Sequence, residues 1–145
     1  MLAKVRMFYD MICYLNILKD RQPLKLTPKG NLPRNFCRDL HDSGIKDEEL
    51  PVMSSHPINV ELDSMYIHVL NLFTRMLGLT RKRQGKISLT RKALERLQKQ
   101  NTGDFFREVF SAYTKEFNWA YSDGYPESWI IQAGWAKLVD ELFVE

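Results

Sequence analysis

The sequence lacks the residue patterns that mark most enzymes and disulfide-stabilised proteins. It has two cysteines in 145 residues, too few for a disulfide framework, and no C-x-x-C pair that would indicate a zinc site. It also has no glycine-rich phosphate loop, no nucleophile-elbow pattern and no H-E-x-x-H motif. We therefore expect a protein that is not an enzyme and that needs no metal and no cofactor.

Long apolar runs are missing as well. The first apolar stretch, Met7 to Leu18, is interrupted by Asp10 and Asn16 and has no small-residue cleavage site. It therefore resembles neither a signal peptide nor a membrane span. The composition, 44% hydrophobic and 27% charged, is that of a globular protein long enough to bury a core. We expect a cytoplasmic protein that does not contact a membrane.

The net charge of +3 hides a strong local imbalance. Residues 1–74 hold nine basic and nine acidic side chains, residues 75–99 hold nine basic and one acidic, and residues 100–145 hold three basic and eight acidic. The local balances are therefore 0, +8 and −5. A net charge of +8 within one short segment creates a local electric field that attracts anions far more strongly than the overall charge implies.

Hydrophobic periodicity predicts a mainly helical chain with one small β-hairpin. Helices are expected at about 4–20, 31–43, 60–77, 90–99 and 103–117, with a last helix beginning at Ser128. Short strands are expected at 24–27, 81–83 and 87–89, the last two joined by a tight turn at Gly85. Residues 45–59 are expected to form mostly loop.

The helix expected at 60–77 has two contrasting faces. Its apolar stripe comprises Leu62, Met65, Tyr66, Val69, Phe73, Met76 and Leu77. Its polar residues recur at intervals of four, three and four, which places them on one opposite face: Ser64, His68, Asn71 and Arg75. Asparagine and arginine can hydrogen-bond to base edges from a helix that lies in a groove. This polar face is therefore a candidate nucleic-acid surface.

The segment Leu70 to Leu97 contains LGLTRKRQGKISLTRKALERL, an order of helix, strand, basic turn, strand and helix. It resembles the end of the recognition helix, the wing hairpin and the following helix of winged-helix regulators. The resemblance implies a winged-helix-like core over residues 1–100, followed by an aromatic-rich helical pair at 101–145 that packs on the same domain. Its basic side chains would lie along the phosphates of duplex nucleic acid: Arg81, Lys82, Arg83, Lys86, Arg91 and Lys92.

Two features favour a partner other than DNA. About 15 residues separate the second and third expected helices, whereas a helix-turn-helix joins them through three or four. Glu61 and Asp63 stand at the start of the third helix, where the bases would be contacted and where carboxylates repel phosphate. A protein-interaction or dimerisation module without nucleic-acid binding is therefore the main alternative.

The C-terminal third supplies the surface for that alternative. Eleven of the 17 aromatic residues lie in residues 103–145. They either close a core or form a homodimer or partner interface, with Trp129, Trp135, Leu138 and Leu142 as the candidate contacts. The runs FNWAYSDGYPES and LTPKGNLPRNF are also similar to a group of prokaryotic proteins without an assigned activity.

A third, more remote hypothesis concerns catalysis. Cys37 and His41 are four residues apart on one expected helix, the spacing of a thiolate–imidazole pair or of half a metal site. Cys37 adjoins the apolar Phe36 and Leu40, so a buried, inert thiol is the expected outcome.

Overall fold

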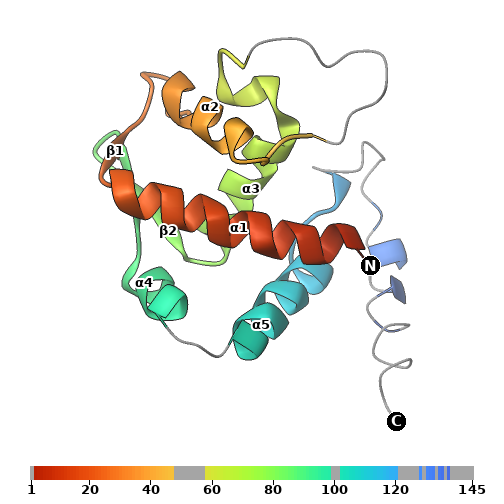
Figure 1. Ribbon diagram of the computed structural model, residues 1–145. Helices are drawn as coiled ribbons and strands as arrows, with labels where there is room; N and C mark the ends of the chain where they lie inside the picture. The colour runs from red at the N-terminus through yellow and green to blue at the C-terminus, as the bar shows by residue number, and fades with distance from the viewer. Residues whose placement is uncertain are drawn as a thin grey trace. The chain divides into compact units, whose positions relative to one another are not determined.

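In the computed structural model, the described residues are 2–47, 58–98 and 102–120, with 128, 130–132, 134, 135 and 137. The chain divides into two compact units, Met1–Gln100 and Asn101–Glu145. The described part of the first unit holds four α-helices, a 3-10 turn and a three-stranded antiparallel sheet, whose arrangement can be followed in Figure 1. The prediction of a mainly helical chain with a small hairpin is confirmed. The packing of the second unit on the first stays a prediction.

The helices and strands follow one another closely along the described part of the chain. In order they are α1 (Leu2–Arg21), β1 (Leu24–Lys25), α2 (Arg34–Asp42), the 3-10 turn η1 (Glu61–Asp63), α3 (Met65–Met76), β2 (Thr80–Arg83), β3 (Lys86–Leu89), α4 (Arg91–Gln98) and α5 (Thr102–Lys115). Most of the loop expected at 45–59 lies outside the described residues. Among the described helices, none is long and apolar enough to cross a membrane.

The sheet has the strand order β1-β3-β2, so β3 is its central strand. The hairpin of β2 and β3 closes through Gln84 and Gly85, whose φ angles are +51° and +69°. Positive φ at both central residues defines a type I′ turn, which matches the twist of paired strands. The tip is tied to the chain after β1, because the backbone N–H of Leu26 donates to the carbonyl oxygen of Gly85 at 2.8 Å.

Hydroxyl caps set the starts of α3 and α4. The Ser64 Oγ accepts a hydrogen bond from the backbone N–H of Ile67 at 3.3 Å, so α3 begins at Met65, five residues later than expected. The predicted cap of the next helix is confirmed, because the Thr90 Oγ accepts from the N–H of Ala93 at 3.3 Å. Such caps satisfy donors that have no partner inside the helix.

The core of the first unit is built around α1, which contacts α3, β3 and α4. Tyr14 is fully buried and packs edge-on against the ring of Phe36 at a centroid distance of 5.8 Å. Other fully buried side chains come from every layer: Met11, Leu15, Leu18, Leu40, Ile67, Leu70, Phe73, Leu79 and Ile87. Each such side chain contributes roughly 1.5–3 kcal/mol through burial. This core holds the hairpin and α3 in fixed positions beside α1.

The second unit is described mainly through α5. Its buried side chains are Phe105, Val109 and Ala112. Apolar periodicity predicts a buried side with Phe106, Val109, Phe110 and Tyr113. Val109 is buried as expected, whereas Phe106, Phe110 and Tyr113 are half-buried, and the rings of Phe106 and Phe110 stack at 6.0 Å. The expected buried face of α5 is therefore confirmed only in part.

Candidate nucleic-acid interface

The alternation of the strands separates the basic residues of the hairpin into two sets. Ile87, Leu89 and Thr80 are buried, and they define the inner face of the sheet. The residues adjacent to these on each strand have side chains on the outer face, because successive side chains of a strand point to opposite faces of the sheet. The outer sheet face therefore carries four exposed cations: Lys25, Arg81, Arg83 and Lys86.

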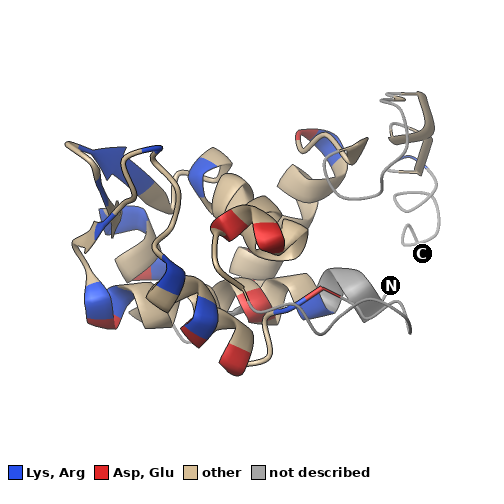
Figure 2. Cartoon of the chain, turned by 90° about the horizontal axis from the view of Figure 1, so that it is seen from above, with Lys and Arg blue, Asp and Glu red and all other residues tan. Residues whose placement is uncertain are grey.

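Three of these cations form a row across the sheet. Lys86 on β3 is paired with Lys25 on β1 and with Arg83 on β2. Side chains directly opposite on antiparallel strands are about 4.5–5.5 Å apart at Cβ, and like charges in such pairs are destabilising. The three strands contain no acidic residue. In Figure 2, blue marks Lys and Arg along the hairpin. The row concentrates positive charge at a cost in stability.

Lys82, which the sequence placed with the phosphate-binding residues, lies on the inner face. It pairs with the buried Ile87, and its Nζ donates to the carbonyl oxygen of Gly30 at 2.5 Å. Burial and the nearby Arg75 guanidinium lower the pKa of Lys82, against a weaker opposing effect of Glu61. Lys82 therefore ties the turn after β1 to the hairpin.

The two basic residues that begin α4 have neighbours of their own. The Arg91 Nε is 2.9 Å from the Glu95 Oε1, one helical turn away. The Lys92 Nζ donates to the carbonyl oxygen of Leu77 at 2.7 Å, at the C-terminal end of α3. Arg91 is highly exposed, so its ion pair with Glu95 is weak and leaves the guanidinium able to bind a phosphate instead. Lys92, by contrast, helps to terminate α3.

The polar face of α3 does not face solvent, which corrects the sequence-based expectation. Ser64 and Asn71 are 2% and 1% exposed, and the His68 side chain is 25% exposed. Besides capping α3, the Ser64 hydroxyl donates to the Asp47 Oδ2 at 2.7 Å. Arg75 is half-buried, and its Nε is buried without a hydrogen-bond partner among the described residues.

Two of these polar side chains, His68 and Asn71, face inward because Glu61 supplies their acceptor. Glu61 is 1% exposed. Its Oε1 accepts from His68 Nδ1 and from Asn71 Nδ2, both at 2.8 Å. Its Oε2 accepts from the backbone N–H of Leu32 at 2.6 Å. The Tyr14 hydroxyl extends the chain by donating to Asn71 Oδ1 at 3.2 Å. We call these five residues the Glu61 network.

The network changes the properties of the groups around it. Burial, followed by the Glu61 charge, raises the pKa of the Tyr14 hydroxyl far above its ordinary value. Because a carboxylate only accepts hydrogen bonds, the His68 Nδ1 carries the proton in this contact. Three donors bind one carboxylate, and through it the network connects three parts of the chain: α1, the segment that precedes α2, and α3.

The apolar stripe expected on α3 is only partly buried. Val69, Phe73 and Leu77 belong to the core, but Met65 is 51% exposed and Met76 is 41% exposed. Just before α3, Val60 and Leu62 are 50% and 56% exposed. The solvent side of this helix is therefore apolar.

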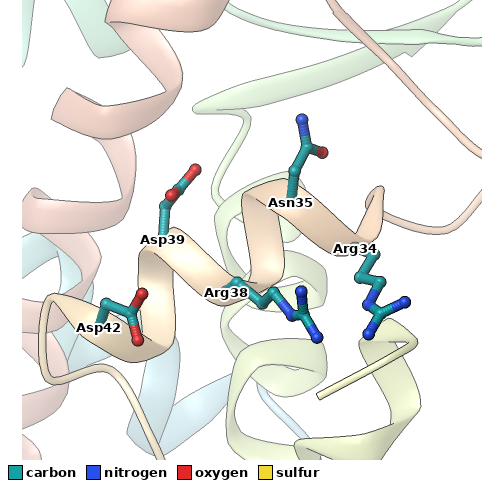
Figure 3. Close-up of a pocket in the computed structure, with 5 residues that line it drawn as sticks. All are labelled: Arg34, Asn35, Arg38, Asp39 and Asp42. Atoms are coloured by element: carbon teal, nitrogen blue, oxygen red, sulfur yellow. The ribbon is translucent and has the colours of Figure 1, made fainter. Parts of the chain in front are cut away.

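An open groove of about 540 Å³ lies along α2, and Figure 3 shows the five side chains that line it. Arg34 and Arg38 extend from one side of the helix, and Asn35 and Asp39 extend from the other. Asp39 forms an ion pair with Arg21. With Asp42, the lining holds two cations and two anions, so it does not favour one sign of ligand.

The catalytic hypothesis gains no support from the geometry. Cys37 is fully buried, and its Sγ lies 3.9 Å from the carbonyl oxygen of Leu32. Burial and then the Glu61 charge raise the pKa of Cys37 to about 12. His41 is instead exposed beside Asp42. Among the residues that the structure describes, no group of three His, Cys, Asp or Glu side chains is placed to hold a metal ion.

Of the proposed C-terminal interface, Trp135 is 37% exposed, and Trp129, Leu138 and Leu142 lie outside the described residues.

Two residues that matter were missed from the sequence. Lys25 joins the basic row only through the pairing of β1 with β3. Glu61 was noted in the sequence only as a carboxylate that repels phosphate, and its role as a buried acceptor was missed, although it continues the three-four spacing of the α3 polar residues toward the N-terminus.

Comparison with known proteins adds no relative to this description. No family model, no curated protein and no solved structure matches the chain.

Proposed function

We propose that this chain is a winged-helix-like module that binds nucleic acid through the outer sheet face. The observation that carries the proposal is the row of Lys25, Lys86 and Arg83, three exposed cations in cross-strand register. Such a row repels itself in the free protein, and an anionic polymer relieves that repulsion. Arg81 adds a fourth charge on the same face.

The order of elements supports the winged-helix part of the proposal. A helix, a short strand and two further helices precede a hairpin, and the first strand pairs with the last strand of that hairpin. This is the arrangement that the resemblance implies. The hairpin of β2 and β3 would be the wing, and α3 would be the helix before it.

Fluorescence anisotropy with a labelled duplex of about 20 base pairs and random sequence tests the proposal at low salt. We expect a dissociation constant of about 1–100 µM, the range of backbone-driven binding. A variant with Lys25→Glu, Arg83→Glu and Lys86→Glu should lose this binding. If wild type does not bind, or if the triple variant binds equally well, the proposal is wrong.

A control comes from α1, to be compared with the single variant Lys86→Glu, which changes the net charge by the same amount. Lys19 is exposed on α1. This helix contacts β3, and the buried side chains of β3 define the inner face of the sheet, so Lys19 is not part of the outer sheet face. The Lys19→Glu variant changes the net charge by two without touching the outer sheet face. We expect its affinity to stay within about twofold of wild type. A large loss there would mean that total charge, rather than the outer sheet face, determines binding.

Protein interaction is the second candidate function, and the solvent side of α3 favours it. Leu62, Met65 and Met76 are exposed apolar side chains on one helix and the turn before it. Methionine is common on surfaces that accept partner helices. Light scattering of wild type and a Met65→Gln, Met76→Gln variant tests the homodimer form of this idea. It predicts a dimer that the variant weakens.

A further inference from the structure

If the outer sheet face binds nucleic acid, the next question is what it recognises. In a winged-helix-like module, the two surfaces to compare are the outer sheet face, on the wing, and α3, the helix before it. They differ completely in chemistry, because the first carries only cations and Ser88, whereas the second is apolar on its solvent side. This difference decides which parts of a nucleic acid each surface is able to recognise.

Base recognition needs free donors and acceptors on the element that enters a groove. In α3, Ser64, His68 and Asn71 are already engaged inside the protein, and Arg75 is half-buried with a Nε that lies out of contact with solvent. Asn71 donates to Glu61 and accepts from Tyr14, and Ser64 accepts from Ile67 while it donates to Asp47. Freeing Asn71 would leave the buried Glu61 carboxylate short of a donor, which is unfavourable for a buried charged group.

The basic row fits a phosphate backbone in spacing as well as in charge. Neighbouring strands lie about 4.8 Å apart, so the row from Lys25 to Arg83 spans roughly 10 Å. One strand of a duplex carries a phosphate about every 3.4 Å of helix axis, and successive phosphates are farther apart along the winding backbone, so about two lie over that distance. The three cations thus face neighbouring phosphates of a single strand.

We propose that the outer sheet face follows one phosphate backbone and binds nucleic acid of any base sequence, while α3 makes no base contacts. This inference rests on the proposed function. It predicts that a single-stranded oligonucleotide competes with the duplex for the protein. It also predicts that all duplex sequences of equal length bind with the same affinity to within a few fold.

The first test is selection from a random duplex library, with sequencing of the bound fraction. A flat distribution supports the inference, and an enriched motif overturns it. Wild-type protein that binds no duplex at low salt is a different result, because it overturns the proposed function itself. The full 145-residue chain is used in each case.

The second test places negative charge on the solvent side of α3. Met65 and Met76 are exposed, so a Met65→Glu, Met76→Glu variant keeps the core intact. If α3 lies away from the nucleic acid, its affinity stays within about threefold of wild type. If α3 enters a groove, two added carboxylates beside phosphates abolish binding and overturn the inference. A Met65→Gln, Met76→Gln variant separates the effect of charge from that of lost apolar surface, and thermal melting verifies folding.

Discussion

Reversing one charge on the sheet should stabilise the free protein while it weakens ligand binding. Lys86 lies between Lys25 and Arg83 in cross-strand register, so it takes part in two like-charge pairs. Lys86→Glu converts both into opposite-charge pairs. Each cross-strand pair is worth roughly 0.2–1 kcal/mol, so the free energy of unfolding should rise by about 1–2 kcal/mol. For a chain of this size, that gain raises Tm by a few degrees.

Urea unfolding followed by circular dichroism measures this gain at two salt concentrations. At low salt, Lys86→Glu should be more stable than wild type, and Lys86→Gln, which removes repulsion without adding attraction, should lie about halfway between them. Near 1 M salt the Debye length falls to about 3 Å, and the three stabilities should converge. The same Lys86→Glu protein should bind duplex more weakly. A Lys86→Glu protein less stable than wild type at low salt would refute the reasoning.

Three further predictions concern the parts that support this face. Glu61→Ala removes the acceptor for three donors and should lower the free energy of unfolding by about 3–5 kcal/mol in urea titration; a loss below 1 kcal/mol would contradict a structural role. Gln84→Asn should raise Tm slightly, because asparagine tolerates the positive φ of a type I′ turn better; a lower Tm would argue against that turn. Native Cys37 should resist a thiol reagent at pH 8, whereas half-buried Cys13 reacts. Unfolding releases the Cys37 proton near its ordinary pKa of 9.0 rather than about 12, so stability should fall as pH rises between them. A Cys37→Ala protein should lose less stability over that range.

The hairpin was predictable because its signals are local. Gly85 between two short basic and apolar runs indicates a tight turn, and the strands were found within a residue or two of their observed ends. Strict alternation along β2 would also have separated inner Lys82 from outer Arg83. The position of Lys25 was not predictable in the same way, because its neighbour Lys86 is 61 residues away in the sequence.

The orientation of α3 was the part that periodicity alone could not give. The helical periodicity of the apolar residues places Met65 and Met76 in the core and Asn71 at the surface. All three positions are wrong, because the two methionines are exposed and Asn71 is buried. Burying the polar side is possible only because Glu61 and Tyr14 satisfy Asn71, and Glu61 also accepts from His68. Such specific hydrogen bonds offset a desolvation cost that a hydrophobic pattern counts as prohibitive.

The salt dependence of duplex affinity tests the central role of the outer sheet face most directly. With three to four phosphate contacts, a plot of log affinity against log salt should have a slope of about −3 to −4. Arg83→Ala should make this slope shallower by about 0.9, because one contact is lost. Lys82→Met, one residue away but on the inner face, should leave the slope unchanged. Equal slopes for wild type and Arg83→Ala, or a shallower slope for Lys82→Met alone, would contradict the account.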